Sequence, residues 1–198
     1  MVRSLIAAIA LGMVVSADLA AQSTGTPVFM APYRAFKNYE IGGSLTDPGS
    51  AWTFEGFYRW AADVLDLGLR TGVWSPDNGE SRFLIGGDLR TRVVTHTDNF
   101  PLDGAFTLGL GGSFGGGADE GYIPVGFSLG RRILLENSAI SFSPYAHPVL
   151  TPSFGASGDL LFTLGLGVDI KFTQHFDLRV SGGIGDLDGV GISAAYVH

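Results

Sequence analysis

Four histidines are the side chains of this sequence best suited to acid–base chemistry. His147 is the strongest catalytic candidate, because Ser141, Ser143 and Tyr145 share its face if this stretch is a β-strand. A serine hydrolase also needs an acid that orients the imidazole, and no acidic residue is near His147 in the sequence. The other histidines fall at an expected strand end, in a turn and at the C-terminus: His96, His175 and His198. We therefore name no catalytic residue and expect a protein that is not an enzyme, with a lipid-modifying or proteolytic barrel as a less favoured alternative.

Metal and cofactor motifs are also weak in this sequence. It contains no cysteine and no His-x-x-x-His pair, and Asp186-Leu187-Asp188 supplies too few ligands for a calcium loop. The glycine-rich run 111–117 lacks the lysine and the following helix of a phosphate-binding loop. We expect neither a metal nor a cofactor.

Charged residues in a two-faced hairpin, from Trp52 to Val73, offer a different kind of chemistry. One set of alternate positions is apolar, aromatic or small, and the other set carries charges: Glu55, Arg59, Asp66 and Arg70. A two-residue turn at Ala62-Asp63 places Arg59 opposite Asp66 and Glu55 opposite Arg70. Both would be stabilising pairs of opposite charge across neighbouring strands.

The same pattern returns near the end of the chain. A three-residue loop, Thr173-Gln174-His175, places Lys171 opposite Asp177 and Asp169 opposite Arg179. Further charges fall on expected inward faces: Arg82, Asp88, Arg90, Arg92 and Arg132. Because the opposite faces are apolar, we interpret the charged face as the inside of a barrel whose outside contacts lipid.

The elements that must position these residues are β-strands. Thirty glycines spread through alternating apolar residues indicate about ten strands. The stretch Ala139 to Val149 is the weakest, because Pro144 and Pro148 predict a bulge, an edge or an early end and could lower the count to eight. Tight turns alternate with longer loops, except at the connector from Thr95 to Gly104, which would form a small plug or a turn extension. The fold class expected is all-β, an antiparallel up-and-down transmembrane β-barrel of about 8–10 strands.

The first 21 residues have the layout of a signal peptide. Arg3 precedes an apolar run from Leu5 to Val15, and small residues follow near Ala21. The expected organisation is a signal peptide at 1–21, a short segment at 22–35 and the barrel at 36–198. Hydrophobic residues make up 45% of the chain and the mean hydropathy is +0.27, as suits a membrane barrel. The net charge of −7 gives no reason to expect nucleic acid as a partner.

Glycines on the inward faces raise the question of what fills the lumen: Gly109, Gly111, Gly126, Gly130, Gly165 and Gly167. They leave either a wet passage or space for Arg90, Arg92 and Arg132, and we expect the arginines to fill it. The barrel would then be largely closed. One alternative is a narrow pore or a channel for small hydrophobic solutes. Another is a soluble, exported, lipocalin-like binding barrel with its apolar face inside.

Residues 36–198 resemble the small outer-membrane β-barrel superfamily that includes OmpA-, OmpX- and OmpW-like proteins. The stretch that carries the resemblance best is residues 165–180, a strand, a tight turn and a second strand. The resemblance implies an outer-membrane location, outer-membrane lipids as partners, and the barrel-assembly machinery as a partner during biogenesis. Because the sequence offers no catalytic constellation, we expect a non-enzymatic protein with a structural or surface role.

Overall fold

A closed ring of antiparallel strands is the main feature of the computed structural model, which describes residues 23–49, 51–116, 119–155 and 158–198. In chain order the strands are β1 (Tyr39–Asp47), β2 (Ala51–Ala62), β3 (Leu65–Pro76), β4 (Arg82–Val94), β5 (Asp103–Phe114), β6 (Glu120–Tyr122), β7 (Val125–Gly130), β8 (Ile133–Leu134), β9 (Ser141–Gly155), β10 (Leu160–Lys171), β11 (Phe176–Gly185) and β12 (Gly189–Val197). Among these described residues, no helix is both long and apolar enough to span a membrane.

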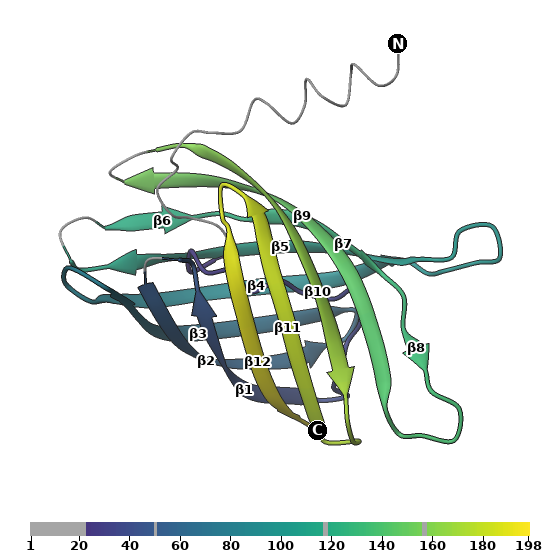
Figure 1. Cartoon of the computed structure of the whole chain (residues 1–198). Coiled ribbons are helices and arrows are strands. Elements are labelled where there is room, and N and C mark those ends of the chain that lie inside the picture. Colours follow the sequence, from purple (N-terminus) through teal and green to yellow (C-terminus); the bar gives the residue numbers. More distant parts are fainter. Residues whose placement is uncertain (1–22, 50, 117–118, 156–157) are drawn as a thin grey trace, which may run out of the picture.

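The strands follow one another around the ring in chain order. β1 pairs with β12, from Glu40 opposite Val197 to Asp47 opposite Val190, and this pairing closes the ring. β6 and β7 both lie between β5 and β9, and β8 pairs with another part of β9. These three short strands therefore together occupy the place of one strand in the ring. The described residues therefore form a ten-stranded, up-and-down, antiparallel barrel (Figure 1). This confirms the predicted all-β, antiparallel, up-and-down barrel, at the upper end of the predicted strand number.

The two faces of the barrel wall differ sharply in polarity. Outward-facing apolar side chains are widely exposed, among them Trp52 at 60%, Phe54 at 62% and Leu110 at 65%. The carboxylates of Glu40 and Glu55 instead face inward and belong to residues that are 0% exposed. A lipocalin-like barrel has its apolar face inside and its charged face in water, so that alternative is wrong.

The two prolines of β9 do not interrupt it. β9 runs without a break for 15 residues and pairs with β10 from Ser141 to Pro152, so the predicted bulge, edge or early end is wrong. The interruption lies in the neighbouring position instead, where Pro124 separates β6 from β7. Proline removes a backbone donor, and the β7–β9 pairing skips the two residues of β9 at His147 and Pro148.

The turn of the first charged hairpin lies one residue farther along than predicted. β2 ends at Ala62 and β3 begins at Leu65, so the turn consists of Asp63 and Val64, with Asp63 at a φ of 58°. Arg59 therefore lies opposite Gly68 and Glu55 opposite Gly72. The predicted register of this hairpin is wrong by two residues. The register of the second hairpin is confirmed, with Asp169 opposite Arg179 and Lys171 opposite Asp177.

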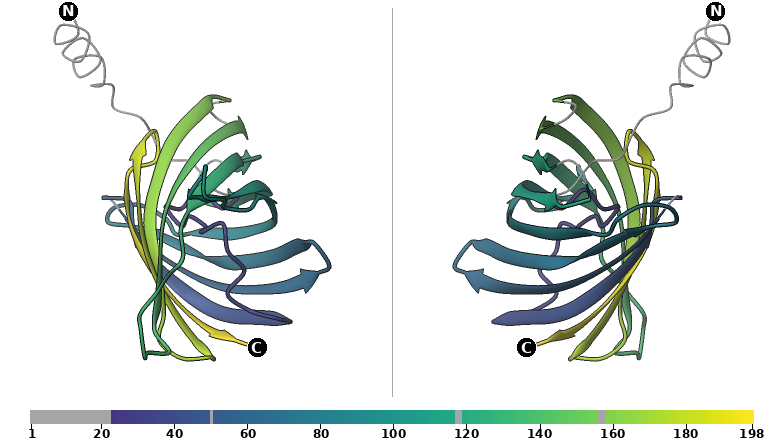
Figure 2. Two further views of the ribbon diagram at one scale, coloured as in Figure 1. Left: turned by 90° about the vertical axis from the view of Figure 1, so that its right-hand side faces the viewer. Right: turned by 90° about the vertical axis from the view of Figure 1, so that its left-hand side faces the viewer.

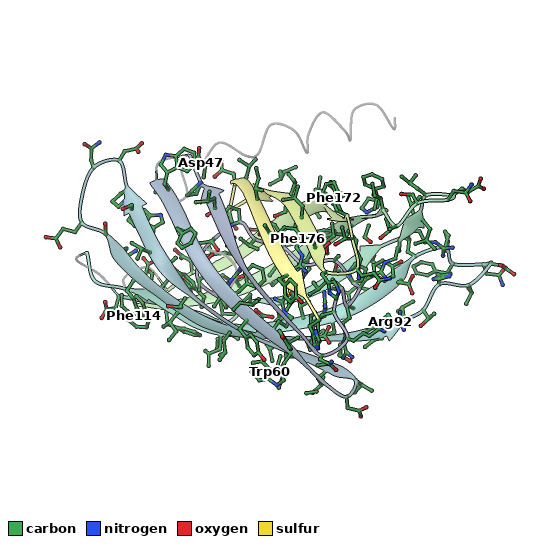
Figure 3. The ribbon with its side chains drawn as sticks, turned by 90° about the horizontal axis from the view of Figure 1, so that it is seen from below. Asp47, Trp60, Arg92, Phe114, Phe172 and Phe176 are labelled. Atoms are coloured by element: carbon green, nitrogen blue, oxygen red, sulfur yellow. The ribbon has the colours of Figure 1, made fainter. Side chains whose placement is uncertain are left out.

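The ring has two ends, which we call the C-terminal mouth and the opposite end. The C-terminal mouth carries His198, the β2–β3 turn and the connector 95–102, and Figure 3 places Arg92 and Phe172 toward it and Asp47 and Phe114 toward the opposite end. The connector 95–102 is a turn extension, in which Thr97 and Phe100 exchange backbone hydrogen bonds. It exceeds the connectors 77–81 and 186–188 at the opposite end in length. The length of 95–102 is the exception that the sequence predicts, but the connector 135–140 at the same end also exceeds 186–188 in length, so the predicted contrast between tight and open ends does not hold.

Candidate functional site

The lumen of the barrel is filled by the chain's own residues 23–36, which we call the luminal segment. Most of its residues are buried, including Phe29 at 2% exposure and Ala31 at 1%. Figure 2 shows this segment, in dark purple, running inside the ring of strands without forming a strand of its own. An eight-stranded barrel is filled by its side chains, whereas a wider ring needs additional material. The predicted signal peptide, residues 1–21, lies outside the described residues.

Hydrogen bonds from the wall satisfy the backbone of the luminal segment. The Ser181 hydroxyl donates to the Pro27 carbonyl at 3.1 Å, and the Tyr145 hydroxyl donates to the Phe29 carbonyl at 3.0 Å. The Thr26 hydroxyl donates to Glu55 at 2.8 Å. Because buried backbone groups need partners, these wall residues hold an irregular segment that has no sheet or helix to satisfy it.

His147 is one of these anchors. Its Nδ1 accepts the backbone N–H of Met30 at 3.3 Å, which leaves Nε2 as the protonated nitrogen that lies 2.8 Å from the Thr107 hydroxyl. Ser128 completes the arrangement by donating to the Met30 carbonyl at 2.6 Å. His147 is 1% exposed, so solvent does not reach its ring. His147, the strongest catalytic candidate in the sequence, therefore positions the luminal segment.

Glycines give the luminal segment its space. A Cβ built on Gly165 would lie 2.1 Å from the Phe29 ring, and one on Gly111 would lie 2.1 Å from the Ser23 carbonyl oxygen. Gly126 and Gly167 accommodate His147 and the Tyr145 hydroxyl in the same way. The prediction that arginines fill the glycine-lined space is therefore wrong: the segment and two wall side chains occupy it.

Glu40 is the centre of the luminal charge network. Its carboxylate accepts from Arg59 Nη1 at 2.7 Å and from Arg179 Nη2 at 2.5 Å. Arg59 also reaches Asp88 at 2.9 Å, and Arg179 reaches Asp177 at 2.8 Å. Two guanidinium groups thus share one fully buried carboxylate, and each has a second acidic partner. Such pairing offsets part of the large cost of burying charge.

The structure brings together two of the four predicted charge pairs. Glu55 lies 3.6 Å from Arg70, and Asp169 lies 3.6 Å from Arg179. Gly72 permits the first contact despite the shifted register, because a Cβ there would lie 2.6 Å from the Glu55 Cγ. The long side chains therefore lean diagonally across glycine.

The other two predicted pairs are wrong. Arg59 pairs with Glu40 and Asp88 rather than with Asp66, because the shifted register places Gly68 opposite Arg59. Lys171 lies opposite Asp177 on the backbone, but its Nζ donates to the Ala35 carbonyl of the luminal segment at 3.0 Å. The luminal segment thus takes the place of the ion-pair partner that strand pairing alone would give to Lys171.

Asp66 joins the wall to the luminal segment. It accepts from Arg90 Nη2 at 2.6 Å and also pairs with Arg34, a residue of the segment. Arg90 in turn donates to the Ala31 carbonyl at 2.8 Å. Arg82, another predicted luminal charge, lies toward the opposite end, 3.7 Å from Glu120.

A cavity of about 340 Å³ lies where the luminal segment reaches the C-terminal mouth, and we call it the vestibule. It is lined by Pro32, Tyr33, Arg34, Asp63, Val64, Asp66, Arg90, Arg92 and Arg132. Four arginines against two aspartates leave an excess of two positive charges on its walls. Both Arg34 and Arg90 are paired with Asp66. The vestibule is therefore basic, although the whole chain is acidic.

The two remaining arginines of the vestibule have no acidic partner within ion-pair distance in the part of the chain that the structure describes: Arg92 and Arg132. The Arg132 guanidinium lies 4.6 Å from the centre of the Tyr33 ring, and its buried Nε has no hydrogen-bond partner there. Guanidinium groups bind phosphate and carboxylate through paired donors. This arrangement is suited to binding an anion.

A second polar cluster lies beside the vestibule. Asp103 accepts from the Tyr33 hydroxyl at 2.6 Å, and His96 Nδ1 lies 2.7 Å from the same carboxylate. The Tyr33 hydroxyl also accepts the backbone N–H of Arg132 at 2.7 Å. No serine, threonine or cysteine joins His96 among the side-chain contacts of the described residues, so the cluster lacks the nucleophile of a hydrolase. It instead fixes Tyr33.

Sequence reasoning missed the most connected residues of this site. Glu40 is absent from the predicted charge pairs, because its role depends on Arg179, which is 139 positions away in the chain. Arg34 and Tyr33 stand in a segment without strand periodicity, so the pattern gave no reason to place them inside the barrel. One signal was available: several inward glycines in successive strands required something large to fill the space between them.

Comparisons with known proteins add a fold likeness. No family model and no curated protein sequence matches the chain. Among solved structures, it is similar to LpxR from Salmonella typhimurium at 8% sequence identity and a TM-score of 0.44, over 88% of this chain and 80% of LpxR. At this distance we transfer no residue role or activity from LpxR to this chain.

The functional prediction from the sequence needs correction in two respects. We expected a non-enzymatic barrel with a structural or surface role and a lumen closed by charge pairs. The non-enzymatic role has no support from the comparisons. The closure of the lumen is also different, because the luminal segment fills the space between the charged walls.

Proposed function

We propose that this protein is an integral outer-membrane barrel that binds a small anion in its vestibule. The observation that carries the proposal is the pair Arg92 and Arg132, which face a cavity of about 340 Å³ without an acidic partner among the described residues. Arg92 is exposed and Arg132 is half-buried, so an anion from solution can reach both guanidinium groups and supply the counter-charge that they lack. The binding site would then be built by the strands and the luminal segment together.

The outer surface supports the membrane part of this proposal. Its exposed apolar side chains cover strands on all sides of the ring, and a closed barrel leaves no unpaired strand edge in hydrocarbon. An even number of antiparallel strands with apolar residues outside is typical of bacterial outer-membrane barrels. Together with the resemblance of residues 36–198 to OmpA-, OmpX- and OmpW-like proteins, this favours outer-membrane lipids and the barrel-assembly machinery as partners.

Tryptophan quenching tests the membrane placement. Trp52 faces outward and is 60% exposed, whereas Trp74 lines an internal cavity with Thr24 and Gly25. In vesicles whose acyl chains carry bromine, we expect emission from a variant that keeps only Trp52 to fall at least about twofold more than from one that keeps only Trp74, because quenching needs contact with the chains. Equal quenching would contradict the assignment of the two faces.

Calorimetry with inorganic phosphate tests the binding site. We expect full-length protein in detergent micelles to bind phosphate, and Arg92→Gln and Arg132→Gln each to weaken the affinity by about tenfold, since one charge-assisted hydrogen bond contributes about 1.5 kcal/mol. Arg131→Gln is the matched control, because Arg131 donates to the Pro101 carbonyl and does not line the vestibule. Absence of binding, or equal affinity in all four proteins, would overturn the proposal.

A further inference from the structure

The vestibule has walls from two parts of the chain that are not fixed to each other by strand pairing. Pro32, Tyr33 and Arg34 belong to the luminal segment, while the remaining lining residues belong to β3, β4, the β2–β3 turn and the β7–β8 connector. An anion in this cavity therefore contacts the segment on one side and the barrel on the other. It contacts both only while the segment is in place.

Arg132 shows how closely the two walls are connected. Its Nη2 donates to the Arg34 carbonyl at 3.4 Å, its backbone N–H donates to the Tyr33 hydroxyl, and its guanidinium covers the Tyr33 ring. The same guanidinium group thus faces the cavity and holds the end of the segment. Arg92, by contrast, lines the cavity and makes no hydrogen bond with the segment among the described contacts.

We infer that occupancy of the vestibule by a phosphate-bearing anion locks the luminal segment in the lumen. This inference rests on the proposed function. A ligand that binds the arrangement with the segment in place, and not the arrangement with the segment displaced, must shift the equilibrium toward the first. The coupling is reciprocal, so displacement of the segment also lowers the affinity of the vestibule for the anion.

The pairing of Arg34 with Asp66 decides whether a bound anion strengthens or weakens the attachment of the luminal segment. Arg34 also donates from Nη2 to the carbonyls of Asp63, at 2.8 Å, and Leu65, at 3.1 Å. These bonds hold the guanidinium against the turn, with the cavity alongside. An anion in the cavity adds a second counter-charge near Arg34 without removing the first. Binding therefore strengthens the attachment of the segment rather than competing with it.

Hydrogen exchange of the full chain in detergent micelles, read by mass spectrometry, tests the lock. With saturating inorganic phosphate, we expect exchange at Val28 to Ala31 to slow at least fivefold relative to potassium chloride of equal ionic strength. Peptides from β1, which neither lines the vestibule nor hydrogen-bonds with the luminal segment among the described contacts, are the internal control and should exchange at unchanged rates. Equal slowing of β1 would overturn the inference, because it would report general stabilisation.

Two variants separate the possible failures. Arg92→Gln should exchange like the wild type without phosphate and should lose the phosphate effect, because Arg92 touches the ligand site alone. Arg132→Gln should exchange faster even without phosphate, because it loses contacts with Tyr33 and Arg34. If calorimetry shows phosphate binding while exchange of the segment does not change, the lock is overturned and the proposed binding site stands. If phosphate does not bind, both are overturned.

Discussion

Deletion of residues 23–36 should turn a sealed barrel into one that conducts ions. The cavity beside Val28, Phe29 and Met30 has a volume of about 20 Å³, room for about one water molecule. Without the segment, the wide ten-stranded ring retains glycines and charged side chains around an empty, wet interior. In planar bilayers we expect discrete current steps from the deletion variant and none from the full chain.

Two glycine substitutions provide a matched comparison that leaves the chain length unchanged. Gly165→Leu places its side chain where the Phe29 ring lies, so it should displace the segment and produce steps. Gly56→Leu faces outward and has no atom within 4 Å of the added Cβ, so it should stay sealed. Regular current steps from the full chain or from Gly56→Leu would contradict the assignment of the segment as the seal.

Replacement of Glu40 by Ala should cause the largest loss of stability of any single substitution considered in the barrel wall. It leaves Arg59 and Arg179 without the carboxylate that they share, and removal of one partner from a buried ion pair costs about 3–5 kcal/mol. The free energy of unfolding, measured by urea titration of refolded protein in detergent micelles, should fall by at least about this amount.

Controls distinguish the lost charge from a general effect of substitution. Glu136→Ala removes an exposed carboxylate from the connector 135–140 and should change the unfolding free energy by less than about 0.5 kcal/mol. Glu40→Gln keeps the size of the side chain and should show most of the loss, because the two guanidinium groups lose their counter-charge. An unfolding free energy for Glu40→Ala equal to that of Glu136→Ala would show that the network does not depend on Glu40.

The strands and their faces could be predicted from the sequence because side chains of a strand alternate strictly. Trp52 and Phe54 lie outside and Glu55 lies inside, as the alternation predicts. The register of the first hairpin could not be predicted in this way. A shift by two residues keeps every side chain on its original face, so the pattern is compatible with both registers. Only the turn at Asp63-Val64 distinguishes them.

The partners inside the lumen were harder to predict for a different reason. An inward side chain has possible partners on two flanking strands and across the lumen, whereas the pattern of a hairpin predicts only the partner on the paired strand. Arg59 thus reaches Glu40 on one side and Asp88 on the other. The luminal segment has no alternation at all, and its position is set by contacts with wall residues far along the chain, such as His147 and Ser181.

The enclosed position of the luminal segment also constrains the order of folding. Phe29 sits against glycines of β10 and β11 that leave no space for even a Cβ, so this ring cannot be drawn along the lumen after the wall is complete. Its contacts with Ser181 span 152 residues of the chain. The luminal segment must therefore lie inside the unfinished sheet before the last strands are added, and β1 and β12 pair only then. Because the barrel closes around the luminal segment through contacts between residues far apart in the sequence, this topology folds slowly.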